Sequence, residues 1–164
     1  MRKRLIPILL VAACTSAEDG PTDSPPATSR QVGGVEYSAD TRVMESFPVQ
    51  LGMSVTARNT SGAAVTLEFP DPCVPRLEAY RDSARSGEPA WSQERAIGCA
   101  AVIHVVEIGA GRTHELGAPT VSAYDVLGDS LPDGRYWLSA VLMPNGQRLE
   151  LPAGAADLAV PRDE

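Results

Sequence analysis

The sequence predicts an all-β protein, an immunoglobulin-like β-sandwich of about seven to nine short antiparallel strands. Three observations indicate this fold class. Apolar and polar residues alternate with a period of two in several segments, turn residues recur at close intervals, and no segment shows a helical period. The 164 residues include fourteen glycines and fourteen prolines, which favour many turns over long helices. This length fits one folded domain together with some unstructured sequence.

The first thirteen residues have the pattern of a secretion signal. Residues 2–4 form a cationic start, and the apolar run over residues 5–13 is too short to span a membrane. The motif VAAC at residues 11–14 resembles the lipobox of bacterial lipoproteins, in which the cysteine thiol receives a diacylglyceryl group and the leader is cut before it. We therefore expect residues 1–13 to be a signal peptide and Cys14 to be lipidated.

The lipid on Cys14 predicts the cellular address. Two or three acyl chains, palmitate among them, make anchoring durable, so the protein should lie on a membrane of the cell envelope rather than cross it. Thr15 stands where an aspartate would retain a lipoprotein in the inner membrane of enteric bacteria. The expected address is the outer membrane in a Gram-negative cell and the cell surface otherwise. Residues 14–34, rich in Ser, Thr, Pro, Asp and Gly, predict a disordered tether, and residues 35–164 form the expected domain.

The central element of the predicted domain is a hairpin over residues 49–69. Asn59 is expected to face Ala63 across a three-residue loop, Thr60-Ser61-Gly62, so that the apolar residues of both strands share one face. A tight turn is expected at residues 131–134, and the Asn-Gly pair within residues 144–147 predicts a hairpin. The other expected strands cover residues 35–47, 76–82, 102–108, 112–116 with a continuation over 120–126, 135–143, 148–151 and 156–160.

Two cysteines remain once Cys14 is assigned to lipid. Cys73 and Cys99 form an even pair in an exported protein, which predicts a disulfide. Closing a loop of about 26 residues should stabilise the fold by roughly 3.5 kcal/mol in the chain-entropy model. The bond would hold the polar segment Ser83–Gly98 against the sandwich. A redox role is the weaker alternative, because reactive pairs are usually close together as Cys-X-X-Cys.

No pattern typical of an enzyme or a cofactor site is found in the sequence. His104 and His114 lack the neighbouring ligands that zinc requires, and no Gly-X-Ser-X-Gly motif is present. Asp125, Asp129 and Asp133 lack the alternating oxygen ligands of a calcium loop. The net charge of −7, about −10 without the leader, disfavours a nucleic-acid partner. We expect a protein that is not an enzyme and that binds no metal, cofactor or nucleic acid.

Several stretches, in this order, resemble the BsuPI family, the domain named for an intracellular proteinase inhibitor of Bacillus. The resemblance covers about residues 47–143 and implies a β-sandwich that binds proteins, with protease inhibition as a further implication. The chain departs from the family pattern in its cysteine pair, in its export, and in Ala110, where a proline commonly precedes the turn glycine. The matching stretches are residues 55–61 (VTARNTS), 65–69 (VTLEF), 87–91 (GEPAW), 108–111 (IGAG) and 131–138 (LPDGRYWL).

The expected function is that of a membrane-anchored lipoprotein whose sandwich binds an unknown protein without catalysis. Inhibition of a protease is the sharper form of this hypothesis, with the segment Ser83–Gly98 as the binding loop. Glu88, Pro89 and Trp91 are its candidate contact residues, although the favoured role of Trp91 is to cover one end of the core. The competing hypothesis is a structural or accessory component of the cell envelope that binds through a sheet edge.

Overall fold

The computed structural model describes residues 29–46, 48–117 and 120–161. The predicted signal peptide, Cys14 and most of the predicted tether lie outside these residues. The described chain is an all-β sandwich, as predicted, although it contains eleven strands rather than seven to nine. Four of the strands have only two or three residues, which explains the larger count. Among the described residues, no helix has the length and apolar character needed to cross a membrane.

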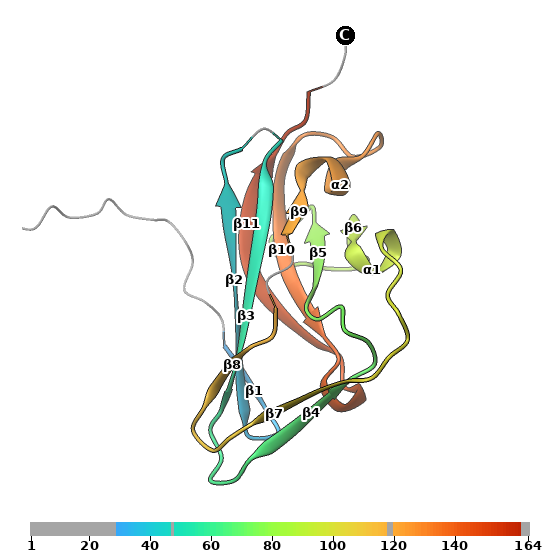
Figure 1. The fold of residues 1–164 in the computed structure, drawn as a ribbon. Helices are drawn as coiled ribbons and strands as arrows, with labels where there is room; N and C mark the ends of the chain where they lie inside the picture. The colour runs from blue at the N-terminus through green and yellow to red at the C-terminus, as the bar shows by residue number, and fades with distance from the viewer. Residues whose placement is uncertain (1–28, 47, 118–119, 162–164) are drawn as a thin grey trace, which may run out of the picture.

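Two antiparallel sheets and a two-stranded ribbon surround one core (Figure 1). The first sheet contains β1 (Arg30–Val32), β2 (Val35–Met44), β3 (Gln50–Asn59), β8 (Thr113–Glu115) and β9 (Thr120–Ser122). The second sheet has the order β11 (Leu149–Leu158), β10 (Gly134–Leu142), β5 (Arg76–Tyr80) and β6 (Trp91–Ser92). The ribbon pairs β4 (Val65–Phe69) with β7 (His104–Ile108), and we call it the β4–β7 ribbon. It lies at the end of the molecule opposite the C-terminus. Short helical segments are α1 (Gln93–Ala96), α2 (Ala123–Leu127) and η1 (Pro144–Gly146).

Alternate side chains of the long strands form the core, as the period of two predicts. The side chains buried from β3 and β10 are Leu51, Met53, Val55, Ala57, Tyr136, Leu138, Ala140 and Leu142. Tyr37 of β2 is buried among them, which raises its pKa to about 12. Tyr136 Oη donates a 2.7 Å hydrogen bond to Pro132 O, four residues upstream. This bond is the tyrosine corner typical of immunoglobulin-like sandwiches, and it fixes the turn that leads into β10.

The predicted hairpin over residues 49–69 is wrong, because β3 and β4 belong to different layers. β3 pairs with β2, β8 and β9, whereas β4 pairs with β7. Buried Asn59 redirects the chain between them: its Nδ2 donates to Ala63 O at 2.7 Å and to Ile108 O at 2.8 Å. Its Oδ1 accepts from both the N and Oγ of Ser61. The apolar faces of the two strands therefore reach the same core from different layers.

The predicted tether ends earlier than expected, because its last residues belong to the fold. β1 pairs with β2 through a two-residue turn, Gly33-Gly34, in which φ is +59° and +77°. A type I′ turn needs positive φ at both positions, so paired glycines favour this hairpin. Arg30 also donates from Nη1 to Glu150 O of β11 at 3.2 Å.

Other predicted strands have different bounds in the structure. The strand expected over residues 120–126 stops at Ser122, because Ser122 and Asp125 form a capping box that begins α2. The strand expected over residues 102–108 begins at His104. The two short strands expected at the C-terminus are parts of one strand, β11, which pairs along the full length of β10 with one bulge.

Candidate functional site

The predicted binding loop, Ser83–Gly98, borders the second sheet and contains β6 and α1. Trp91 pairs with Ala79 in the sheet and packs, half-buried, against the core. The structure therefore supports the packing role that was favoured for Trp91. Pro89 is half-buried and its carbonyl oxygen accepts a 2.7 Å hydrogen bond from Arg95 Nη2. Glu88 is exposed, so its carboxylate is available to a partner.

Arg85 braces the base of this loop against the sheet. It has a φ of +52°, and its guanidinium donates to Leu138 O at 3.2 Å and to Gly154 O at 3.1 Å. These carbonyls lie where a bulge shifts the register of β10 against β11. Burial lowers the pKa of Arg85. Ser86 is held as well, since its N and Oγ both donate to Asp82 Oδ1.

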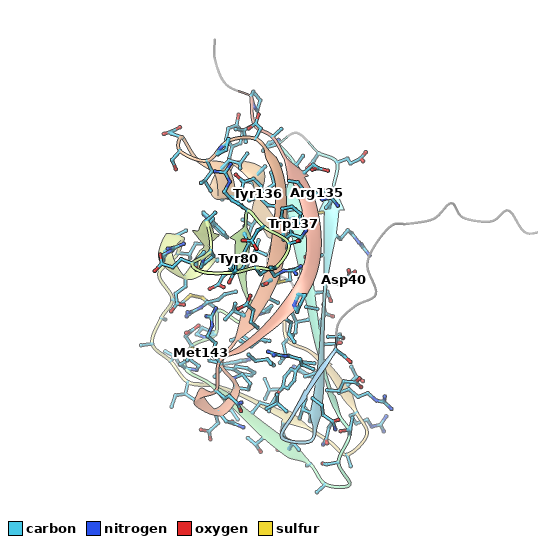
Figure 2. The ribbon with its side chains drawn as sticks, turned by 180° about the vertical axis from the view of Figure 1, so that it is seen from behind. Asp40, Tyr80, Arg135, Tyr136, Trp137 and Met143 are labelled. Carbon is cyan, nitrogen blue, oxygen red and sulfur yellow. A yellow bond between two sulfur atoms is a disulfide. The ribbon has the colours of Figure 1, made fainter. Side chains whose placement is uncertain are left out.

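A buried polar cluster covers the outer face of the second sheet beside the loop. Tyr80 Oη donates to Glu78 Oε2 at 2.7 Å, and Arg148 Nη2 donates to the same oxygen at 2.9 Å. Burial, and after it the hydrogen bond to Glu78, raise the pKa of Tyr80. Tyr80 lies opposite Trp137 in the sheet, and the two side chains are close together in Figure 2. Because Glu78 and Tyr80 are both buried, the cluster stabilises the sheet and offers little surface to a ligand.

The predicted disulfide between Cys73 and Cys99 is present. Asp71 Oδ1 accepts a hydrogen bond from Cys73 N, and Arg76 forms ion pairs with Asp71 and with Glu94. The disulfide and the ion pairs together connect the turn after β4, the start of β5 and helix α1. They hold the chain between α1 and β7 near its midpoint, at Cys99.

The segment between α1 and β7, together with the start of β7, exposes large apolar side chains. Ile97, Val102, Ile103 and Val105 are 48%, 62%, 67% and 55% exposed, and we call these four side chains the β7 patch. They are the four most exposed large hydrophobic residues in the part of the chain that the structure describes. The sequence did not predict the patch, because a β-branched run has the same pattern whether its strand is covered or open.

The histidines and aspartates considered as ligands do not converge in the described chain. His104 stacks on Phe69 with a centroid distance of 6.2 Å, His114 is exposed on β8, and Asp125 caps α2. Within the described ranges, the single group with the spacing of a metal site is Asp71 with Cys73 and Cys99. Its two sulfur atoms are bonded to each other and therefore offer no thiolate.

No family model matches the sequence, and a search of curated proteins found no match. The functional proposal therefore depends on the loop Ser83–Gly98, on the β7 patch and on strand β7 itself.

Proposed function

We propose that this chain is a lipid-anchored lipoprotein of the bacterial cell envelope whose β-sandwich binds another protein without catalysis. The observation that carries the proposal is the β7 patch, four large apolar side chains within residues 97–105 that stay about half exposed or more. Apolar patches on soluble folds commonly mark interaction surfaces. The disulfide at Cys99 fixes the segment that presents the patch, so little conformational entropy is lost on binding.

Protease inhibition is the more specific form of the proposal. It is supported by the loop Ser83–Gly98, which Arg85 and Arg95 hold in one conformation; we call it the braced loop. Arg85 fixes one end of residues 86–89 and Arg95 holds the carbonyl of Pro89 at the other. A loop held in one conformation enters a protease cleft at small entropic cost and is a poor substrate for cutting. The BsuPI-like stretches support the same form of the hypothesis.

A second candidate function, an accessory component of the envelope, is favoured by a different observation. In the described chain, β7 pairs with β4 and with no other strand, so one of its edges is open. An open edge accepts an added strand from another protein. The loop and the edge are separate on the chain, so variants of each distinguish the two functions.

Titration against a panel of bacterial serine proteases and metalloproteases tests the inhibitory form. The full chain, purified in detergent micelles with its disulfide intact, is expected to abolish substrate turnover of a target protease at equimolar ratio while remaining uncut. The double variant Glu88→Ala/Pro89→Ala should weaken inhibition about tenfold or more, because both residues belong to the segment that Arg85 and Arg95 hold. Asp129→Ala, in an exposed turn outside the loop, is the matched control and should inhibit normally. If no protease is inhibited, the inhibitory form is refuted and the accessory function becomes the proposed function.

Substitution Cys14→Ser tests the anchor. We expect the variant to incorporate no alkyne-labelled palmitate in cells and to move from the detergent phase to the aqueous phase in Triton X-114 partitioning, because the acyl chains hold the protein to lipid. The double variant Cys73→Ser/Cys99→Ser should retain the label. A Cys14→Ser protein that carries as much label as the wild type would contradict lipidation at this residue.

A further inference from the structure

The backbone of β7 presents hydrogen-bonding groups to its open edge. Glu68 of β4 faces Val105 of β7 in the ribbon, yet Glu68 N donates to Asn145 Oδ1 of η1 at 2.9 Å. The N–H of Glu68 therefore points away from β7. In an antiparallel pair, two facing residues either exchange both hydrogen bonds or both point their backbone groups outward. The N–H and C=O of Val105 accordingly point to the open edge of β7. Because the pattern repeats every second residue, the N–H and C=O of Glu107 point to the same edge.

The two edges of the β4–β7 ribbon differ in protection. The outer edge of β4 is covered at Glu68 by the Asn145 side chain, and η1 packs beside β4. The outer edge of β7 has no such cover in the described chain, and both Val105 and Ile103, the residue before β7, are exposed. Folded proteins usually block open edges with charges, prolines, bulges or covering loops. An edge that is left open and apolar is therefore suited to binding another strand.

The outward face beside this edge is acidic as well as apolar. The side chains of Val105 and Glu107 share one face of β7, and their partners on β4, Glu68 and Thr66, share it with them. Glu68 and Glu107 are exposed, and neither forms an ion pair within the described chain. A strand that brings cationic side chains next to these carboxylates would complement them, because opposite charges on neighbouring strands attract.

We propose that the open edge of β7 binds an extended segment of a partner protein as an added strand. The bound strand carries apolar side chains beside Ile103 and Val105 and a lysine or arginine beside Glu107. This inference rests on the proposed protein-binding function and names the kind of partner. Backbone hydrogen bonds to Val105 and Glu107 supply affinity, and the alternating side chains supply specificity. A second copy of this chain complements the face less well, because it brings the same carboxylates and a negative net charge, about −10 without the leader.

Fluorescence anisotropy with two labelled peptides tests the proposal on the full chain in detergent micelles. One peptide alternates valine with lysine and the other alternates valine with glutamate. The wild type is expected to bind the lysine peptide and to bind the glutamate peptide about tenfold or more weakly, since close like charges oppose pairing. No binding of the lysine peptide at millimolar concentration would overturn the proposal.

Two proline variants separate edge pairing from general charge attraction. Val105→Pro removes an N–H that points to the open edge, so it should weaken binding of the lysine peptide about tenfold while the β4 ladder stays paired. Thr66→Pro is the matched control, because by the same alternation its N–H points to the opposite edge of the ribbon. It should bind the peptide as the wild type does. Equal binding by both variants and the wild type would overturn the proposal.

The charge variant Glu107→Lys gives a readout that a purely structural role would not change. We expect it to reverse the preference, so that the glutamate peptide binds more tightly than the lysine peptide. An unchanged preference would contradict the role of Glu107. Sedimentation of the wild type that shows self-association, abolished by Val105→Pro, would place a second copy at the edge and overturn the proposed partner. Protease inhibition by a chain that binds neither peptide would refute the edge proposal while leaving the proposed function intact.

Discussion

Replacing Asn59 by alanine should lower the free energy of unfolding by about 4 kcal/mol, because several buried hydrogen bonds are lost at once. Asn59 is fully buried, and its amide group satisfies two carbonyl oxygens while its oxygen accepts two bonds from Ser61. The alanine variant leaves the buried Ile108 carbonyl without this donor. Urea unfolding followed by circular dichroism measures the loss.

Two further variants decide which atoms of Asn59 matter. Asn59→Asp keeps the acceptor but loses the donors and buries a charge, so it should be at least as destabilising as alanine. Ser61→Ala removes one hydroxyl partner of Asn59 and should cost about 1 kcal/mol. A loss below about 1 kcal/mol for Asn59→Ala would show that the turn forms without these bonds. Hydrogen exchange should also become faster in β7, because Asn59 connects the first sheet to the β4–β7 ribbon.

The second large effect is expected from the disulfide. The double variant Cys73→Ser/Cys99→Ser should be less stable than the oxidised wild type by about 3.5 kcal/mol in the chain-entropy model. The bond closes a loop between positions 26 residues apart, and its loss frees that loop in the unfolded chain. Reversible unfolding in guanidinium chloride checks the value, provided that both proteins unfold in one step.

Reducing agent provides the control for this measurement. It should destabilise the wild type to the level of the double variant and leave the double variant unchanged. Equal stability of the oxidised wild type and the double variant would show that the bond adds nothing to the fold. Limited proteolysis should locate the effect, since residues 97–103 lose their attachment at Cys99 and should be cut first.

Much of the fold could be predicted from the alternation of apolar and polar residues, because this pattern indicates which face of a strand is buried. The sequence predicted four strands near their observed positions, namely β2, β3, β5 and β10. The even number of cysteines left after Cys14 predicted the disulfide. The partner of each strand could not be predicted in the same way. Asn59 separates β3 from β4 through a bond to Ile108, 49 residues away, and no local pattern specifies such a contact.

The candidate site was predictable to a smaller extent. The loop with Glu88 and Pro89 was expected, but its brace was not, because Arg85 contacts carbonyl oxygens of residues 138 and 154. The β7 patch was missed for a different reason. The run over residues 102–108 has the composition of a buried strand, and its exposure depends on whether other chain segments cover it.

The hydrogen bond between Glu68 and Asn145 makes the β4–β7 ribbon one-sided. A ribbon with two open edges can accept a strand on each side, so identical molecules could join head to tail into an unlimited filament. A ribbon with one open edge accepts one strand and then presents no further site. The Asn145 side chain therefore restricts the proposed strand addition to the β7 edge of the ribbon.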